Sequence, residues 1–350
     1  FMADKTPLVS IVIPHWNGIE VLSECIKSLK KTDYNNFEII IVDNFSTDGS
    51  QDWIKKNHSD VKLIQNKKNH GYAGGCNIGA DYSDGEYIVF LNNDTIQNIN
   101  WLSLMASKIE SDKNIAAVQP KILNYFKKDL FDYAGGASGH LDVFCYPFAR
   151  GRLFVTQEVD NGQYDNSINC FWASGTALMV RKNIFIEANK FEESFFAHME
   201  EIDLCWKFIA MGYLVSSEPS AKVFHKNATT LPMYSHKKYY LNHRNSLLML
   251  FGNYSFTNMI KFGVVRLSFE IINLFYSVYK LDINHVTGIL RALFWILFNP
   301  YVIYKKRVHF KEIRKINDDG IMMYMKKSSS IYDYFIKGKK YYFEITSKEA

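Results

Sequence analysis

The sequence predicts an α/β fold with a mainly parallel sheet, followed by a C-terminal helical region. Three observations support this. Short apolar runs alternate with helical segments over residues 8–91, polar residues follow each run, and long apolar helices begin after about residue 238. Alternating strands and helices are typical of βαβ units, whose strands lie parallel. The chain has 350 residues, 47% of them hydrophobic, enough for one large or two medium domains.

Four segments in the first hundred residues have the composition of buried strands. They are apolar, rich in β-branched residues and short, as expected for strands covered on both faces. The predicted strands are residues 8–14, 37–43, 61–66 and 86–91.

Helices are expected between these strands and again near residue 200. Apolar side chains recur at helical spacing in the first helix, the second begins with capping residues, and the third is rich in small residues. The predicted helices are residues 20–31, 46–56, 71–83 and 199–212. Residues 124–168 are rich in Gly, Asn and Asp, and we expect irregular loops there that cover or shape a substrate site. Order is expected to return at 170–182 and 214–225.

Polar residues follow all four strands. In parallel sheets ligands bind beyond the carboxyl ends of the strands, although turns need the same residue types there. Four strand ends carrying Asn or Asp favour a ligand site over turns alone. The residues are Asn17 and Gly18, Asp43 and Asn44, Asn69 and Gly71, and Asn92, Asn93 and Asp94.

Charge divides the chain into two unlike parts. Residues 1–225 carry 21 Lys and Arg against 28 Asp and Glu, whereas residues 226–350 carry 20 against 8. A strongly basic C-terminal part suggests nucleic acid or an anionic membrane surface as a partner. The five cysteines are scattered and odd in number, which indicates reduced intracellular thiols, and the polar start of the chain does not read as a secretory signal.

The C-terminal region contains three apolar helical segments, residues 239–252, 256–280 and 283–304. Charges interrupt each, so we expect helices that lie on a membrane or pack on each other rather than cross it. The second carries one polar stripe, formed by Arg266, Glu270, Asn273, Ser277 and Lys280. Residues 305–315 hold six Lys or Arg and one Glu, which suits anionic lipid. The alternative is a bundle that packs on the first domain or dimerises.

The motifs together resemble a known family. "VSIVIPHWNG", "IIIVDNFSTDGS", "NHGYAGGCNIGA", "FLNNDT", "GTALMVRK" and "MEEIDLCWK" occur in this order. The set resembles family 2 glycosyltransferases of the GT-A fold, most closely the bacterial branch that contains rhamnosyltransferases, over roughly residues 8–250. The resemblance implies a nucleotide-diphospho-sugar transferase fold with a Rossmann-like sheet. It also implies a catalytic domain over 1–238 and a helical, basic region over 239–350 that associates with a membrane or oligomerises.

The resemblance implies a donor site at the strand ends. Asp43 would read the base, since a carboxylate only accepts hydrogen bonds and a pyrimidine offers an N–H; a cap or turn role is the alternative. Glycines let the backbone come close to the nucleotide, and a helix N-terminus favours its negative charge. The implied donor-binding residues are Pro14, Trp16, Asn17, Asp43, Asn69, Gly71, Gly74, Gly75, Asn77, Asn92 and Asn93.

Asp94 ends the segment that stands where the family has an Asp-x-Asp-type motif. The resemblance implies that Asp94 and His225 bind Mn²⁺ or Mg²⁺, which bridges the donor phosphates, with phosphate and water completing the shell. A lone histidine is otherwise more often structural. The cation would neutralise the departing diphosphate.

An acidic helix start would supply the base that removes the acceptor proton. Glu201 stands where relatives have the base, Glu200 is its rival, and Asp203 would orient, pairing with Lys207. The alternative is an acidic N-terminus favoured by the helix dipole. Near the sugar and acceptor the resemblance places Trp172, Ser174, Gly175 and Arg244, although Trp172 is equally suited to the core.

The expected function is inverting, metal-dependent glycosyl transfer. The donor would be dTDP-rhamnose or a UDP-sugar, and the acceptor a hydroxyl of a glycan or lipid-linked glycan in cell-surface polysaccharide synthesis. The protein would be cytoplasmic, peripheral on the inner face of the cell membrane, free of nucleic acid, and able to form a homo-oligomer through its C-terminal helices. Alternatives are a non-catalytic glycan-binding or scaffold subunit of a polysaccharide assembly complex, and a sugar nucleotidyltransferase.

Overall fold

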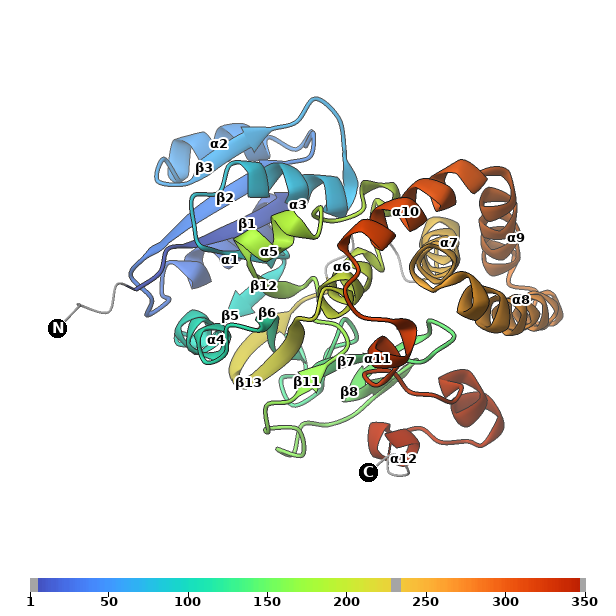
Figure 1. Cartoon of the computed structure of the whole chain (residues 1–350). Coiled ribbons are helices and arrows are strands. Elements are labelled where there is room, and N and C mark those ends of the chain that lie inside the picture. The colour runs from blue at the N-terminus through green and yellow to red at the C-terminus, as the bar shows by residue number, and fades with distance from the viewer. Residues whose placement is uncertain (1–5, 228–233, 347–350) are drawn as a thin grey trace.

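A mixed nine-stranded sheet forms the centre of the molecule (Figure 1). The computed structural model describes residues 6–227 and 234–346, and the following statements concern these residues. The strands lie in the order β11-β13-β6-β12-β4-β1-β2-β3, with β5 beside β13. They are β1 (Val9–His15), β2 (Phe37–Asp43), β3 (Lys62–Gln65), β4 (Tyr87–Leu91), β5 (Thr95–Gln97), β6 (Ile115–Asn124), β11 (Asn169–Cys170), β12 (Ala177–Arg181) and β13 (Leu214–His225).

Most of this sheet runs in one direction. Strands β1 to β4 pair in parallel, and β6 and β13 do so as well. Strand β12 lies antiparallel between β4 and β6, so these two groups share one direction. The carboxyl ends of six strands therefore meet at one edge, as predicted from the βαβ pattern.

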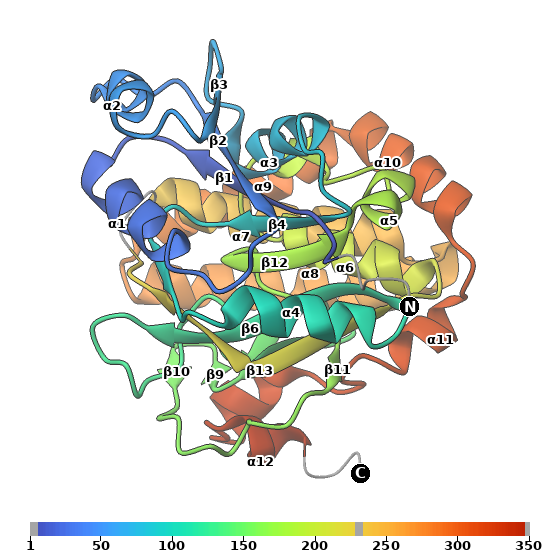
Figure 2. The same cartoon turned by 90° about the vertical axis from the view of Figure 1, so that its left-hand side faces the viewer.

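Helices cover both faces of the sheet. They are α1 (Ile19–Leu29), α2 (Ser50–Asn57), α3 (Gly71–Asp81), α4 (Trp101–Glu110), α5 (Lys182–Glu187), the 3₁₀ turn η1 (Glu193–Phe195) and α6 (Glu200–Ala210). One hydrophobic core joins α1, α2 and α4 to the sheet, and a second joins α3, α5 and α6 to the opposite face (Figure 2). Because successive side chains of a strand point to opposite faces, Ile11 enters one core and Val12 the other.

The predicted elements differ from the observed ones in three places. Helix α2 begins at Ser50, not at residue 46, because Ser46 and Asp48 form turn hydrogen bonds instead. Helix α4 and strand β6 were not predicted. The expected irregular loop over 124–168 is partly wrong, since it holds a second sheet, β10-β9-β8-β7. Its strands are β7 (Ser138–Leu141), β8 (Pro147–Arg150), β9 (Arg152–Leu153) and β10 (Thr156–Gln157).

The C-terminal part is helical, as predicted. It comprises α7 (His236–Asn253), α8 (Phe256–Tyr279), α9 (Ile283–Phe298), α10 (Pro300–Ile313), α11 (Asp318–Met322), the π-helix η2 (Tyr332–Ile336) and α12 (Tyr342–Thr346). Leu248, Tyr254 and Phe310 share the core that contains the α6 side chains. The division at residue 238 stays a prediction, and hydrophobic contacts cross it.

Helix α8 places its polar stripe inward. Arg266 and Glu270 are buried, and Glu270 accepts from Arg266 (Nη2–Oε1 2.6 Å) and pairs with His243 of α7 (2.7 Å). Lys280, at the helix end, is exposed. The wide apolar face therefore points outward, the reverse of an ordinary surface helix.

In the described residues no single helix passes as a membrane span by length and hydropathy. The pair Ile283–Phe298 and Pro300–Ile313, bent by 71°, passes together by length and composition alone.

Candidate active site

Hydrogen bonds join the carboxyl ends of β1 and β2. Asn17, at φ +57°, accepts from the Thr47 N–H (2.8 Å), and its own N–H donates to Ser46 Oγ (2.9 Å). The Gly18 N–H donates to Asp48 Oδ2 (2.7 Å). Two loops that are 30 residues apart thus form one rigid wall, and Trp16 stands on it with 43% of its surface exposed.

Asp43 lies at the base of this wall with no exposed surface. One carboxylate oxygen accepts from the Ser46 N–H (3.1 Å) and from Gln51 Nε2 (2.6 Å). The other oxygen is buried and has no hydrogen-bond partner among the described residues. A buried acceptor without a donor is costly, and a ligand N–H would satisfy it.

His15 connects this wall to the motif after β4. Its Nε2 lies 2.9 Å from Ser50 Oγ, and its Nδ1 lies 2.8 Å from Asn93 Nδ2. Burial lowers its pKa, so the ring is neutral at pH 7 and one nitrogen accepts from the Asn93 amide. Asn93 is therefore held in place by a residue that the motif analysis passed over.

The glycines of α3 serve packing within the protein. Gly71 adopts φ +72°, and a Cβ there would lie 2.3 Å from the Phe196 carbonyl oxygen. A Cβ at Gly75 would meet Asn44 Nδ2 at 2.8 Å and the predicted donor residue Pro14 at 3.2 Å, and one at Gly74 would meet His70. Of these three, Gly75 lets α3 come close to the ends of β1 and β2, and Gly71 lets it come close to the backbone at Phe196.

The two predicted asparagines of this segment bind protein groups. Asn69 accepts from the Gly71 N–H (2.8 Å) and so shapes the start of α3. Asn77 is buried and exchanges two hydrogen bonds with the backbone of Phe191 (2.9 and 3.0 Å). Its side chain is fully used there, which favours a structural role over the predicted contact with the donor.

Asp94 and His225 come together, as the resemblance implied. Asp94 Oδ1 lies 3.1 Å from His225 Nε2, and Asn92 Nδ2 lies 3.4 Å from the same nitrogen. The other ring nitrogen lies 2.9 Å from Asp132 Oδ1. Burial lowers the pKa of His225, but the charges of Asp94 and Asp132 outweigh burial and raise it to about 10. Asp132 comes from the segment expected to be irregular.

This pair fits a divalent cation. Two adjacent ligands of an octahedral Mg²⁺ or Mn²⁺ are about 3 Å apart, as Asp94 and His225 are here. With a pKa of about 10 the ring is protonated and this contact is an ion pair, so a cation would have to displace the Nε2 proton. A carboxylate on the far nitrogen of a metal-binding histidine is a common arrangement. In residues 6–227 and 234–346 no group of three or more His, Cys, Asp or Glu is placed to hold a metal, so the remaining ligands would come from phosphate and water.

Glu200 and Glu201 begin α6 directly after Met199, which adopts φ +73°. Burial and the neighbouring Glu201 raise the pKa of Glu200 well above its usual range. Burial also raises the pKa of Glu201, to about 7, although the backbone N–H groups of Gly175 and Ile202 lower it. Each carboxyl has a buried oxygen without a partner among the described residues. Two charged carboxylates this close repel each other, so both pKa values are raised and the ionised form of Glu200 is the more strongly disfavoured.

Asp203 has a different environment. Lys306 of α10 contacts both of its oxygens (2.6 and 2.7 Å), and Asn253 donates to it (2.8 Å). The predicted partner Lys207 lies farther away, at 3.9 Å. Burial raises the pKa of Asp203, but Lys306 and Lys207 outweigh it and the net shift is downward. Asp203 thus ties α6 to the C-terminal helices.

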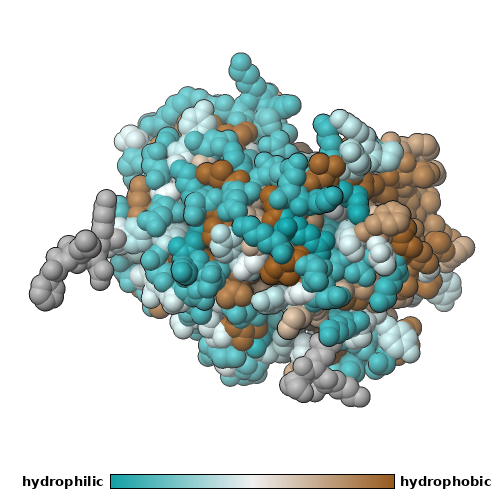
Figure 3. All heavy atoms as spheres, in the orientation of Figure 1, coloured by the Kyte–Doolittle hydropathy of each residue, from teal (hydrophilic) through white to brown (hydrophobic). Residues whose placement is uncertain are grey.

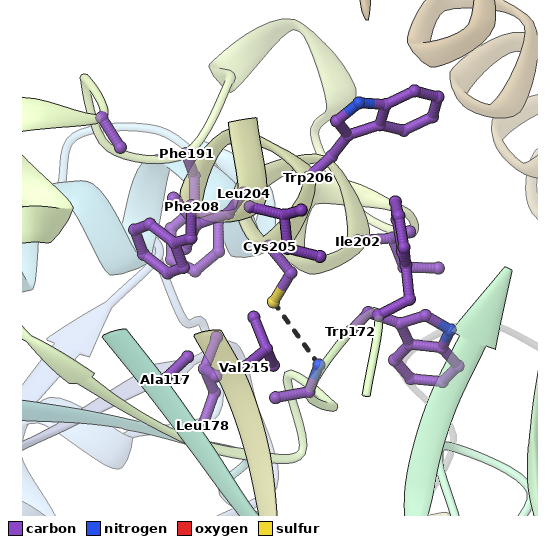
Figure 4. Packing of buried hydrophobic residues seen from close by; sticks show 14 of the residues in the cluster. Ala117, Trp172, Leu178, Phe191, Ile202, Leu204, Cys205, Trp206, Phe208 and Val215 are labelled. Carbon is purple, nitrogen blue, oxygen red and sulfur yellow. Dashed lines mark hydrogen bonds between the residues drawn. The ribbon is translucent and has the colours of Figure 1, made fainter. Parts of the chain in front are cut away.

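Hydrophobic packing fixes α6 over the sheet (Figure 4). Cys205 points toward the sheet, where the Ala173 N–H donates to its Sγ (3.4 Å). Trp206 lies on the other side of the helix, with its ring against Tyr254. The Ala173 bond holds the loop before β12, which contains Gly175, against the first turns of α6. The same loop also contacts the segment that carries Asp94, because the Asn92 N–H donates to the Thr176 carbonyl (3.0 Å). The loop therefore lies between Asp94 and the acidic start of α6.

The predicted acceptor residues lie around this loop but are mostly used internally. Trp172 is 2% exposed and its indole N–H donates to the His140 carbonyl (2.7 Å), which favours the core role over sugar stacking. Ser174 is buried and bonds to the Ala134 carbonyl. The Gly175 carbonyl accepts from Tyr72.

Arg244 holds the loop that leads into α6. It donates to the carbonyls of Ser194 (2.7 Å) and Phe195 (2.9 Å), and its neighbour Asn245 donates to the His198 carbonyl (2.7 Å). Its position therefore supports the shape of the acidic helix start.

Comparison with known proteins identifies a family for the N-terminal half of the chain. The sequence profile described as "Glycosyl transferase family 2" matches residues 10–175. Residues 10–175 therefore carry a glycosyl transferase family 2 domain, which favours the transferase over a sugar nucleotidyltransferase.

Its relatives are distant. An uncharacterized glycosyltransferase of Haemophilus influenzae is 22% identical over 85% of this chain and 87% of its own length. Glycosyltransferase GlyG of Streptococcus pneumoniae is 30% identical over 52% of this chain and 59% of its length. The Escherichia coli UDP-Glc:alpha-D-GlcNAc-diphosphoundecaprenol beta-1,3-glucosyltransferase WfgD is 34% identical over 29% of this chain and 40% of its length.

Solved structures share the fold. The crystal structure of GalNAc-T7 with UDP, GalNAc and Mn²⁺ matches with a TM-score of 0.65 at 14% identity, covering 92% of this chain and 57% of that one. The mannosyltransferase PcManGT from Pyrobaculum calidifontis, in complex with GDP-Man and Mn²⁺, matches with a TM-score of 0.51 at 13% identity, covering 89% and 86%. The chain therefore has the GT-A glycosyltransferase fold.

Proposed function

We propose that the protein transfers a sugar from a nucleotide diphosphate to a hydroxyl group with inversion, Glu201 acting as the base. The observation that carries this proposal is the contrast between the surroundings of Asp94, after β4, and those of Glu201, at the start of α6. Asp94 lies 3.1 Å from His225, whereas Glu201 begins a helix with a pKa of about 7 and, within the described part of the chain, has one buried oxygen without a hydrogen-bond partner. A base with a pKa near the working pH suits proton removal from an alcohol as it attacks.

Each group of the site has a separate role in the proposed reaction. Asp43 accepts from the nucleotide base, and Asp94 with His225 holds the cation. The cation supplies charge neutralisation for the leaving diphosphate. Asp132 keeps the His225 ring oriented, and the Gly175 N–H positions Glu201. Attack from the face opposite the diphosphate gives inversion without a covalent sugar–enzyme intermediate.

The donor and acceptor follow from the family branch and the relatives. The motifs resemble the rhamnosyltransferase branch, which supports dTDP-rhamnose as the first donor, and the relative named for UDP-Glc supports a UDP-sugar as the second. That relative is named for a lipid diphosphate-linked acceptor, which supports a lipid-linked glycan in cell-surface polysaccharide synthesis.

A screen of nucleotide sugars tests the donor site. We expect one nucleotide type to raise Tm only when Mn²⁺ or Mg²⁺ is present, because the diphosphate binds through the cation. At a ligand concentration of about 100 times Kd the stabilisation is about 2.7 kcal/mol. Thermal melts with UDP, dTDP and GDP sugars, each with metal or with EDTA, measure it. The matching nucleoside with metal is the control. Melts that no nucleotide changes would contradict the proposal.

We also propose that the outward apolar face of α8 and α9 rests on an anionic membrane, which places the protein on the inner face of the cell membrane. Figure 3 shows hydrophobic side chains gathered over these helices. The exposed members are Ile260, Val264, Ile271, Ile272, Phe275, Tyr276, Tyr279, Ile283, Leu290, Phe294, Leu297 and Phe298. A patch of this size marks a site of contact, and its polar residues lie inside.

The charged residues around the apolar face of α8 and α9 favour an anionic lipid surface over a second protein as its partner. Between residues 256 and 311 the sequence has two acids, Glu270, which is buried, and Asp282, which is half-buried, whereas Lys261, Lys280 and Lys305 are exposed. Basic side chains around an apolar face attract anionic lipid by about 1 kcal/mol each. The expected lipid contact of the whole run 305–315 needs correction, since Lys306 is buried against Asp203 and Arg314 pairs with Asp318.

Liposome sedimentation tests this surface. Replacing Ile272 and Phe275 together with Gln is expected to release most of the protein from vesicles containing phosphatidylglycerol, because both side chains are more than half exposed and would enter the lipid. Phe126→Gln, an equally exposed site on another element, is the control. Unchanged sedimentation together with loss of a dimer in size-exclusion chromatography would instead assign the face to a homo-oligomer.

A further inference from the structure

Two cations without a counter-charge flank one aromatic ring between the small sheet and α7. Arg152 of β9 lies over the Tyr133 ring at 4.7 Å, and Lys238 of α7 lies 5.9 Å from the same ring. Arg152 is buried and Lys238 half-buried, and among the described residues no carboxylate lies within 4.0 Å of either side chain. Most of the other buried cations in that part of the chain have such a partner.

Arg152 is the less satisfied of the two. It is 8% exposed. Within residues 6–227 and 234–346 its Nε is buried without a hydrogen-bond partner, and its hydrogen bond to the Phe154 carbonyl is long at 3.5 Å. Burial lowers the pKa of Lys238, and Arg152 lowers it further. Burying a guanidinium without an anion is unfavourable, so this arrangement favours binding of an anion from outside.

The start of α7 adds to this positive charge. Ser235 caps the helix at the Lys238 N–H, and the first turn carries His236, Lys237 and Lys238 with no acid. Cations at the positive end of an 18-residue helix are unfavourable in the free protein. A bound anion reverses this, since helix N-terminal N–H groups and basic side chains then act together.

The cluster of Arg152, Tyr133 and Lys238 has the proposed catalytic residues on one side and the apolar helices α8 and α9 on the other. Tyr133 follows Asp132, which holds His225. On the other side Lys237 lies 4.5 Å from the Phe196 ring, four residues before Glu200. Toward the apolar face, His236 bonds to Thr287 (2.8 Å) and Arg291 (3.3 Å) of α9.

We propose that Arg152 and Lys238, at the N-terminus of α7, bind the phosphate or diphosphate of a lipid-linked acceptor. This inference rests on the proposed function. The ligand chemistry is that of a phosphoryl group, which the nucleotide donor also carries. The donor diphosphate is assigned to Asp94 and His225, so a second anion site on the side of the apolar helices suits the acceptor. Its lipid would follow α9 toward the membrane while its sugar reaches Glu201.

Direct binding tests the site without requiring turnover. The probes are farnesyl diphosphate, farnesol and UDP with Mn²⁺, each titrated calorimetrically. We expect farnesyl diphosphate to bind more tightly than farnesol, and Lys238→Gln to weaken farnesyl diphosphate about tenfold or more, as for loss of a charged hydrogen bond. Farnesol and UDP with Mn²⁺ should be unaffected. Lys113→Gln, an exposed lysine beyond α4, controls for net charge.

The outcomes separate this site from the proposed function. Weaker binding of UDP with unchanged farnesyl diphosphate would assign the cluster to the donor and overturn the inference. The inference would also be overturned if Lys238→Gln and Arg152→Gln each bound UDP and farnesyl diphosphate as tightly as the unmodified protein does, provided that both variants melt cooperatively. Wild-type protein that binds neither UDP nor farnesyl diphosphate would count against the proposed function itself.

Discussion

Replacing Glu201 with Gln is expected to lower the rate of sugar transfer by about 10²–10⁴-fold, the usual contribution of a positioned base. Glutamine keeps the shape of the side chain and can still accept from the Gly175 N–H, but it cannot take a proton. Donor affinity should stay unchanged, because Asp43 and the Asp94–His225 pair are untouched. Single-turnover rates and nucleotide titrations measure the two effects separately.

Two further variants decide the assignment between the neighbouring acids. Glu200→Gln should keep more activity than Glu201→Gln, since burial and the neighbouring Glu201 raise the pKa of Glu200 and disfavour its ionised form. Glu187→Gln, which removes an exposed acid at the end of α5, is the matched control. The reverse order of the two active-site variants would transfer the role to Glu200.

The pH dependence has a defined sign. Glu201 acts as a carboxylate and its pKa is about 7, so kcat/KM should rise through neutral pH and level off above it. The inflection should disappear in Glu201→Gln.

Removal of the carboxylate at Asp94 is expected to abolish metal-dependent transfer, because His225 alone would remain as a protein ligand among the described residues. Asp132→Asn should weaken Mn²⁺ binding about 10–100-fold in the presence of UDP, as for other residues that orient a metal-binding histidine. Manganese titrations followed by electron paramagnetic resonance measure the affinity without requiring turnover.

Asp129→Asn provides the comparison for these metal variants. Asp129 lies three residues before Asp132, and its side chain is exposed, so manganese affinity should match that of the unmodified protein. Full Mn²⁺ affinity in both Asp94→Ala and Asp132→Asn would remove the metal site from this position.

Much of the fold could be predicted because its signals are local. Alternating apolar runs and helical spacing define β1 to β4 with α1 and α3 within about two residues. The pairing of Asp94 with His225 came from the family resemblance, and the structure places them together. Asp132 was missed because it lies in a segment without periodicity, where spacing predicts neither contacts nor strands.

Other features depend on contacts that local patterns do not encode. Periodicity indicated that Arg266 and Glu270 share one face of α8, but not that this face points inward. Lys207, one turn from Asp203, was the natural partner by spacing. The observed partner, Lys306, is 103 residues away, and only tertiary packing brings it there.

The Asp203–Lys306 pair makes the acidic start of α6 depend on the C-terminal helices. Removing α10 would leave a fully buried carboxylate with the neutral Asn253 amide (2.8 Å) and with Lys207 as its nearest cation, at 3.9 Å. Breaking such a buried ion pair typically costs about 3–5 kcal/mol. That loss would fall on the same first turn that carries Glu201. A protease that clipped the C-terminal helices would therefore inactivate the enzyme instead of releasing a working soluble fragment.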